Sequence, residues 1–252
     1  MKLVVMENHE EMSKHACQLI VSKVQSLSSP VLGLATGSTP ERLYEMLIEE
    51  YKQKLVSFSH VKTFNLDEYV GLSENDKNSY QYYMNHHLFS EVNFKEGENH
   101  IPNGMASQLE QECQRYEKLI KEAGGIDFQI LGLGHNGHIG FNEPGTLFSS
   151  RTHVVDLERT TREANARFFK SKKEVPTQAI TMGIETILES KQIILLVSGE
   201  QKATALQRLL NGEVSEDFPA SVLKQHQDVT IIADKAALQL QEDEQFAVNS
   251  KR

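Results

Sequence analysis

Residues 130–146 read ILGLGHNGHIGFNEPGT, and this stretch decides the fold class and the place of the site. It begins with apolar residues typical of the end of a buried parallel strand, and the glycines that follow let the backbone turn sharply. Ligands of open α/β sheets bind at the carboxyl ends of such strands. His135, Asn136, His138 and Glu143 are therefore candidate site residues, against the alternative of a well-capped surface turn.

Further apolar runs of strand length recur along the chain, separated by longer amphipathic stretches such as MSKHACQLIVSKVQSL. Strands are predicted at residues 2–5, 31–35, 61–66, 128–133, 179–183, 192–197 and 229–233. The alternation of strands and helices predicts an α/β fold with a doubly wound, mostly parallel sheet and helices on both faces. Without an internal repeat or a Pro- or Ser-rich linker, we expect a single domain over residues 1–252.

One polar stretch, TTREANARFFKSKKEVPTQ at residues 160–178, lacks a strong apolar stripe. We expect it to cover the site as part of a lid segment at about residues 151–180; the alternative is a solvated helix and loop. The last dozen residues, QEDEQFAVNSKR, are expected to fray.

Composition narrows the function classes. The chain has 252 residues, of which 39% are hydrophobic, enough for a full core. Its formal charge of -9 argues against nucleic-acid or anionic membrane partners. Cys17 and Cys113 lie outside any CxxC motif, so neither a disulfide framework nor a cysteine zinc site is indicated. No signal peptide or membrane span is recognisable, and we expect a cytoplasmic protein.

The segment VLGLATGSTPERLYEML reads as a strand, a tight turn and a helix start. Ser38 is the expected N-cap, with Pro40 in the first turn and Glu41 placed for a capping box. Amides and hydroxyls of Gly37, Ser38 and Thr39 at a helix N-terminus form a potential phosphate cradle. The segment is neither a Walker loop nor a GxGxxG motif, and taken alone it could equally be a good helix cap.

Carboxylates follow the next predicted strand in VKTFNLDEYVGL. Either Asp67 or Glu68 could act as a general base at the sheet edge, and alternation along the strand predicts that only one of them faces the site. The alternative is that Asp67 caps a turn and Glu68 is solvated.

Histidines and cations complete the inventory. The spacing of His135 and His138 could indicate a metal site, but a histidine paired with a carboxylate suits proton transfer better. Arg167 in NARFF and Lys202 in SGEQKATAL are candidate phosphate-binding cations. His86 and His87 are interpreted as packing or surface residues.

The motifs ATGSTP, TFNLDEYVGL, GLGHNGHIGFNEP, SRT, ARFF and SGEQKA, in this order, resemble the glucosamine-6-phosphate deaminase family over nearly the whole chain. The Gly-Ser-Thr turn is also similar to that of 6-phosphogluconolactonases. The resemblance implies a Rossmann-like domain and the conversion of glucosamine 6-phosphate and water into fructose 6-phosphate and ammonia, in amino sugar catabolism. The reaction implied by this resemblance requires no metal and no organic cofactor.

The resemblance also implies residue roles. The substrate phosphate would contact the turn at residues 37–39 together with Arg167 and Lys202. His138 would transfer protons during ring opening, oriented by Glu143 and Asn136. Asp67 would carry the proton from C2 to C1 of the open sugar.

Two departures from the family stand out. Many relatives have aspartate where this chain has Asn136, so one acid of the ring-opening group is missing. Members activated by N-acetylglucosamine 6-phosphate carry basic residues where this chain has His153, Val155 and Asp156. We therefore expect no such activation, and a monomer or small homo-oligomer whose partner is a small sugar phosphate.

Two rival functions are a 6-phosphogluconolactonase-like hydrolase and a non-catalytic sugar-phosphate sensor. The FNLDEY and GFNEP motifs speak against the hydrolase. A sensor would usually need a DNA-binding or partner-binding extension, and no basic segment or helix-turn-helix pattern is visible at either end.

Overall fold

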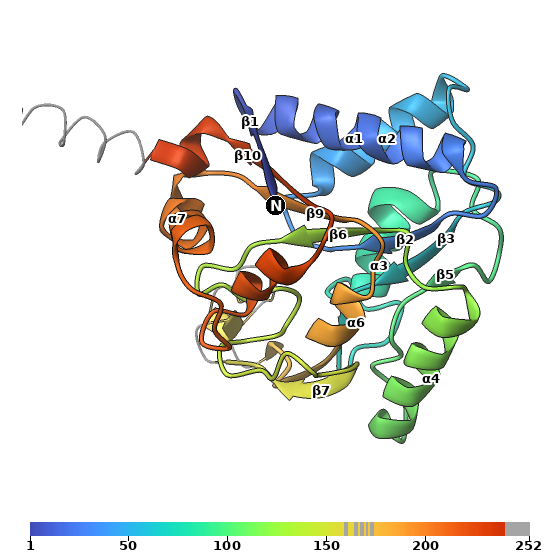
Figure 1. The fold of residues 1–252 in the computed structure, drawn as a ribbon. Coiled ribbons are helices and arrows are strands. Elements are labelled where there is room, and N and C mark those ends of the chain that lie inside the picture. The colour runs from blue at the N-terminus through green and yellow to red at the C-terminus, as the bar shows by residue number, and fades with distance from the viewer. Residues whose placement is uncertain (159–160, 164–165, 167–168, 170, 172–173, 240–252) are drawn as a thin grey trace, which may run out of the picture.

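The computed structural model describes residues 1–158, 161–163, 166, 169, 171 and 174–239 (Figure 1). Its strands are β1 (Lys2–Met6), β2 (Val31–Leu34), β3 (Lys62–Asn65), β4 (Asp67–Tyr69), β5 (Asn99–His100), β6 (Phe128–Gly132), β7 (His153–Asp156), β8 (Gln178–Thr181), β9 (Ile193–Val197) and β10 (Val229–Asp234). Its α-helices are α1 (His9–Ser26), α2 (Glu41–Lys52), α3 (Tyr80–Met84), α4 (Leu109–Glu122), α6 (Ile184–Leu188) and α7 (Ala203–Asn211). Shorter helical segments are the π-helix η1 (Asn85–Phe89) and the 3₁₀ turns η4 (Glu200–Lys202), η5 (Pro219–Gln225) and η6 (Lys235–Leu238).

Seven strands form the large sheet, in the order β1-β10-β9-β6-β2-β3-β5. Every neighbouring pair in it is parallel. Figure 1 shows α1 and α2 on one side of this sheet, and α4, α6 and β7 on the other. The predicted single-domain α/β fold with a doubly wound, mostly parallel sheet is therefore confirmed.

The central strands read as continuous apolar runs because both of their faces are covered. All five residues of β9 and all six of β10 are buried. On α1, Met12, Ala16, Ile20 and Val24 are buried as one stripe, and Asn8 caps the helix by accepting from the Glu11 N–H. Full burial of a Met, Ile or Val side chain contributes about 1.5–3 kcal/mol to folding. In the part of the chain that the structure describes, no helix is long and apolar enough to cross a membrane.

A second, three-stranded sheet has the order β4-β8-β7 and is antiparallel, which corrects the prediction that residues 179–183 belong to the parallel sheet. An apolar run indicates a strand but not its partner. Here β4 extends the chain beyond β3, and β8 pairs with this extension. Leu66 is the single residue between β3 and β4, and it bonds to both sheets. Its N–H donates to the Leu34 carbonyl at 3.1 Å, and its own carbonyl accepts from the Met182 N–H at 2.7 Å.

The strand order reverses between β2 and β6. From β2 the chain continues to β3 on one side, and from β6 it continues to β9 on the other. The turns at the carboxyl ends of β2 and β6 therefore diverge and leave a crevice, which is where open parallel sheets bind ligands.

Candidate active site

A cavity of about 590 Å³ occupies this crevice. It is lined by the turns that follow β2 and β6, by the start of β4, by the segment leading into α3 and η1, and by Lys202 after β9. Segments far apart in the sequence thus meet at one edge of the sheet. The cavity holds the predicted residues Gly37, Ser38, Thr39, Asp67, His135, His138 and Lys202.

The turn after β2 forms one wall. Gly37 has a φ of +99°, in the left-handed region that glycine adopts at little cost. The predicted capping box is wrong: Pro40 itself occupies the N-cap position of α2, and no side chain caps the helix. The helix begins after Pro40, two residues later than predicted, so the Ser38 side chain makes no capping hydrogen bond. Ser38 and Thr39 instead line the cavity beside the N-terminus of α2.

Asp67 begins β4 and lies at the bottom of the cavity, 6% exposed. Burial, with the nearby charge of Glu68, raises the pKa of Asp67 to about 8. Among the described residues, no side chain or backbone group donates a hydrogen bond to its carboxylate. A carboxyl group in this state can take up and release a proton near neutral pH.

Glu68 points elsewhere, as the alternation along the strand predicts. Its carboxylate accepts the backbone N–H groups of Tyr69 at 2.8 Å, Tyr80 at 2.9 Å and Gln81 at 2.8 Å. Burial raises the pKa of Glu68 to about 7, although these three N–H groups act in the opposite direction. Glu68 is thus buried at the start of α3 rather than solvated, and Asp67 lines a cavity rather than capping a turn.

The turn after β6 carries a histidine beside a carboxylate. Nδ1 of His138 lies 3.4 Å from Oε2 of Glu143 and makes no other polar contact within the described residues. Asn136 donates to the same Oε2 at 2.6 Å, and its own oxygen accepts the backbone N–H of His138 at 3.2 Å. Asn136 therefore acts on the imidazole through Glu143 and through the backbone.

Thr161 holds the other oxygen of this carboxylate. Its hydroxyl donates to Oε1 of Glu143 at 2.5 Å, and Thr161 also lines the cavity. Burial alone would raise the pKa of Glu143, but His138, Thr161 and Asn136 together outweigh it, so the pKa of Glu143 is lowered. Glu143 therefore remains charged where it faces the histidine.

The ring of His138 can lie close to the backbone because residue 134 is a glycine. A Cβ atom at residue 134 would lie 2.4 Å from Cγ and Cδ2 of the His138 ring. The N–H of Gly134 also donates to the His138 carbonyl at 2.9 Å, which closes the turn. This glycine is required for contact, not for an unusual backbone angle.

The cationic side of the cavity includes Lys202 and His135. Nδ1 of His135 lies 3.1 Å from the Gln201 carbonyl, and burial, followed by the charge of Lys202, lowers the pKa of His135. Lys77, from the loop before α3, also lines the cavity. The sequence did not predict this, because Lys77 lies in the polar stretch SENDKNS, which is typical of a solvated loop. Arg167 lies outside the described residues.

Aromatic residues missed at the sequence level form the remaining wall. Tyr69 packs against Tyr80 with ring centroids 4.8 Å apart, against Phe141 at 5.7 Å and against Phe169 at 5.9 Å. His87 also lines the cavity, and its ring packs against Tyr83 with ring centroids 4.3 Å apart, in agreement with its interpretation as a packing residue. These positions come from distant segments, and only the tertiary structure brings them together.

Thr161 and Phe169 come from the segment expected to cover the site, and both line the cavity. Several other residues of that segment lie outside the described residues, and the lid stays a prediction. Within the described ranges, no group of three or more His, Cys, Asp or Glu side chains is arranged to hold a metal ion.

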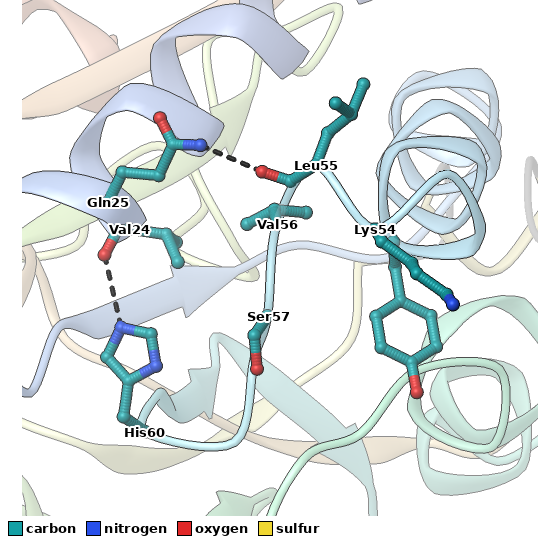
Figure 2. A pocket seen from close by; sticks show the side chains of 8 residues that line it. Val24, Gln25, Lys54, Leu55, Val56, Ser57 and His60 are labelled. Carbon is teal, nitrogen blue, oxygen red and sulfur yellow. Dashed lines mark hydrogen bonds between the residues drawn. The ribbon is translucent and has the colours of Figure 1, made fainter.

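A second hollow of about 330 Å³ lies at the opposite edge of the sheet, between the end of α1 and the loop that precedes β3 (Figure 2). Figure 2 shows His60 reaching the Val24 carbonyl and Gln25 reaching the Leu55 carbonyl; the distances are 3.2 Å and 2.9 Å. No carboxylate lines this hollow. It therefore lacks the acid–base groups of the cavity at the carboxyl edge.

Fold and site together define an α/β protein with an acid–base cavity at the switch point of its parallel sheet. Residues 7–232 match the family of glucosamine-6-phosphate isomerases/6-phosphogluconolactonase. The chain belongs to this family.

Individual relatives narrow the comparison. A glucosamine-6-phosphate deaminase of Oceanobacillus iheyensis is 60% identical over 95% of this chain and 96% of its own length. The solved structure of a monomeric glucosamine-6-phosphate deaminase is 51% identical, covers 95% of this chain and 100% of its own, and has a TM-score of 0.94. A 6-phosphogluconolactonase from Trypanosoma cruzi has a TM-score of 0.77 at 21% identity, with 94% of this chain and 96% of its own covered. That last likeness shows the shared fold alone.

Proposed function

We propose that this protein is a glucosamine-6-phosphate deaminase that converts glucosamine 6-phosphate and water into fructose 6-phosphate and ammonia. Its near full-length similarity to relatives of that name supports the activity. The single observation that carries the mechanism is the pairing of Asp67, whose pKa is raised to about 8, with the His138–Glu143 pair at one cavity.

Substrate binding begins with the phosphate. The turn at residues 37–39 offers backbone N–H groups and two hydroxyls at the N-terminus of α2, where the helix dipole favours an anion. Lys202 supplies positive charge from the other side of the crevice. Arg167 is proposed as a further phosphate contact.

Ring opening follows at the other end of the sugar. His138 takes the proton from the anomeric hydroxyl and delivers a proton to the ring oxygen, which breaks the C1–O5 bond and leaves an aldehyde at C1. The charged Glu143 stabilises the imidazolium that forms in between. Asn136 and Thr161 position Glu143 by holding its two oxygens.

The isomerisation step belongs to Asp67. Its carboxylate removes the proton from C2, which becomes acidic between the aldehyde and the ammonium group, and then returns a proton to C1. In the same step the oxygen at C1 gains one proton and the ammonium group loses one, so the product is a C1 alcohol with an iminium at C2. Water adds to this iminium before ammonia leaves. General acid–base catalysis of this kind contributes about 10²–10⁴-fold for each group.

The test is product release by the purified, metal-stripped protein. We expect equimolar ammonia and fructose 6-phosphate from glucosamine 6-phosphate, and neither product from unphosphorylated glucosamine. Hydrolysis of 6-phosphogluconolactone in place of deamination would assign the hydrolase function. Tight binding of glucosamine 6-phosphate without release of either product would assign a sensor.

We further propose a monomer or small homo-oligomer in the cytoplasm, without activation by N-acetylglucosamine 6-phosphate. The monomeric relative supports the first point. His153, Val155 and Asp156 lie on β7, where they offer an anion little positive charge. Sedimentation measures the mass in solution and so tests the number of subunits. A sigmoidal substrate curve that N-acetylglucosamine 6-phosphate abolishes would contradict the absence of activation.

A further inference from the structure

Two tyrosine–histidine pairs follow each other along α3 and η1. Tyr82 stacks on His86 with ring centroids 6.1 Å apart, and the ring of Tyr83 packs against His87 at 4.3 Å with the two planes tilted by 31°. Both pairs have the i, i+4 spacing that places side chains on one helix face. Only Tyr83 and His87 line the cavity, so the two pairs share a sequence pattern but not an environment.

The difference continues at the phenol hydroxyl. The hydroxyl of Tyr83 donates to the Gly37 carbonyl at 2.8 Å, a contact that joins the helix to the turn after β2. Burial raises the pKa of Tyr83 well above its usual range, so the hydroxyl keeps its proton and remains a donor. The Tyr82 hydroxyl makes no hydrogen bond within the described part of the chain.

The Gly37 carbonyl and the Ser38 N–H belong to the same planar peptide unit and point in opposite directions. Fixing the carbonyl therefore fixes the N–H. Rotation of this unit costs little on its glycine side, because Gly37 at a φ of +99° has no side chain to restrict it. The bond from Tyr83 removes that freedom.

Charge gives a second reason for the contact. A carbonyl oxygen left open to the cavity would present partial negative charge to an incoming phosphate. The Tyr83 hydroxyl covers this oxygen, while the N–H groups and hydroxyls of the turn remain available at the cavity.

We propose that Tyr83, supported by the ring of His87 that packs against it, is a positioning residue that orients the Gly37–Ser38 peptide for the phosphate group of the substrate. This step rests on the proposed function. His87 belongs to a π-helical turn, an irregularity often found at functional sites, and its ring limits the positions that the Tyr83 ring can take.

Tyr83→Phe removes only the hydroxyl, and Tyr82→Phe is the matched control on the same helix. We expect calorimetry with inorganic phosphate to show about three- to tenfold weaker binding in Tyr83→Phe, the scale of one hydrogen bond, and no change in Tyr82→Phe. The KM for glucosamine 6-phosphate should rise by the same factor, with the loss falling on KM rather than kcat. A general loosening of the fold would instead lower kcat and the melting temperature.

Equal phosphate affinity in the two variants would overturn the proposal. Phosphate binding needs no turnover, which separates the two levels of inference. If the wild-type protein releases no ammonia but Tyr83→Phe still binds phosphate more weakly, the proposed function fails and the role of Tyr83 stands. If ammonia is released and the two variants bind alike, the role of Tyr83 fails alone.

Discussion

Asp67 and Glu143 are two buried carboxyl groups of one site, and their surroundings act in opposite directions. Asp67 begins β4 with no donor to its oxygens among the described residues, so burial and Glu68 raise its pKa to about 8. Glu143, after β6, accepts from Asn136 and Thr161 and faces His138, and its pKa is lowered. Burial is common to both, and the number of donors decides the outcome.

This contrast supports the two roles proposed for these carboxyl groups. A carboxyl group whose pKa is about 8 exchanges its proton near neutral pH, so Asp67 in its ionised form can take a proton from one carbon atom and return it to another. A carboxylate that stays charged supports a histidine that becomes cationic during ring opening. The two different carboxyl groups therefore allow the proposed ring opening and the proposed proton transfer to occur in one cavity.

The largest effect is expected from Asp67→Asn, which removes the carboxylate proposed to carry the proton from C2 to C1. Loss of the base should lower kcat by about 10²–10⁴-fold. The folded protein binds the Asp67 proton more tightly than the unfolded chain, so wild-type stability falls as the pH rises through about 8. The variant, without this charge, should melt at a higher temperature than wild type at pH 9 and similarly at low pH.

Exposed Asp228→Asn is the control for this variant and should leave both properties unchanged. Turnover by Asp67→Asn at the wild-type rate would remove Asp67 from the mechanism.

Glu143→Gln tests the other carboxylate. It removes the charge that faces His138, and kcat should fall by about 10²-fold because the imidazolium loses its partner. Binding of inorganic phosphate should persist, because the turn at residues 37–39 is unchanged. Exposed Glu213→Gln serves as the control, measured by ammonia release and by calorimetry. A variant that binds no phosphate would show that Glu143 maintains the whole cavity rather than one step.

Glu68→Gln should bring the two pKa values closer together. The charge of Glu68 helps to raise the pKa of Asp67, so its removal lowers that pKa. Because Asp67 acts as a base only when ionised, the acidic limb of kcat/KM should move to lower pH. Loss of an acceptor for three N–H groups should also reduce the free energy of unfolding by about 1–3 kcal/mol. The pH profile and urea unfolding measure the two effects, and a limb at the wild-type pH would deny the coupling.

The smallest effect is expected from Thr161→Val. It removes the donor to Oε1, so the pKa of Glu143 should rise and the acidic limb of kcat should move to higher pH, with a loss of about three- to tenfold. Thr161→Ser should restore both, and exposed Thr177→Val is the control. If Thr161→Ser behaves like Thr161→Val, packing rather than the hydroxyl explains the loss.

Part of the fold and of the candidate site could be predicted from local sequence patterns. The run at 128–133 and the glycine turn after it form a strand and a site loop because strand, turn and polar residues are contiguous. Alternation likewise separates Asp67 from Glu68. Such features depend only on neighbours in the chain.

Other features depend on contacts across the chain. The pairing of β8 with β4 joins segments more than a hundred residues apart, and an apolar run does not name its partner. Thr161 reaches Glu143, and Tyr83 reaches Gly37, through tertiary structure alone. The expected capping box fails because Pro40 takes the cap position, an outcome set by the exact path of the turn.

Leu66 joins the two sheets, and Asp67, the proposed proton carrier, is the residue that follows it. Proteins open in local units before they unfold globally, and a short antiparallel sheet beside a larger parallel sheet with buried central strands is a natural unit of this kind. If β8 separates from β4, Asp67 loses its strand partner while the large sheet persists. Catalytic inactivation on heating should then precede loss of the overall fold, and hydrogen exchange at residues 67–69 should track the rate of inactivation.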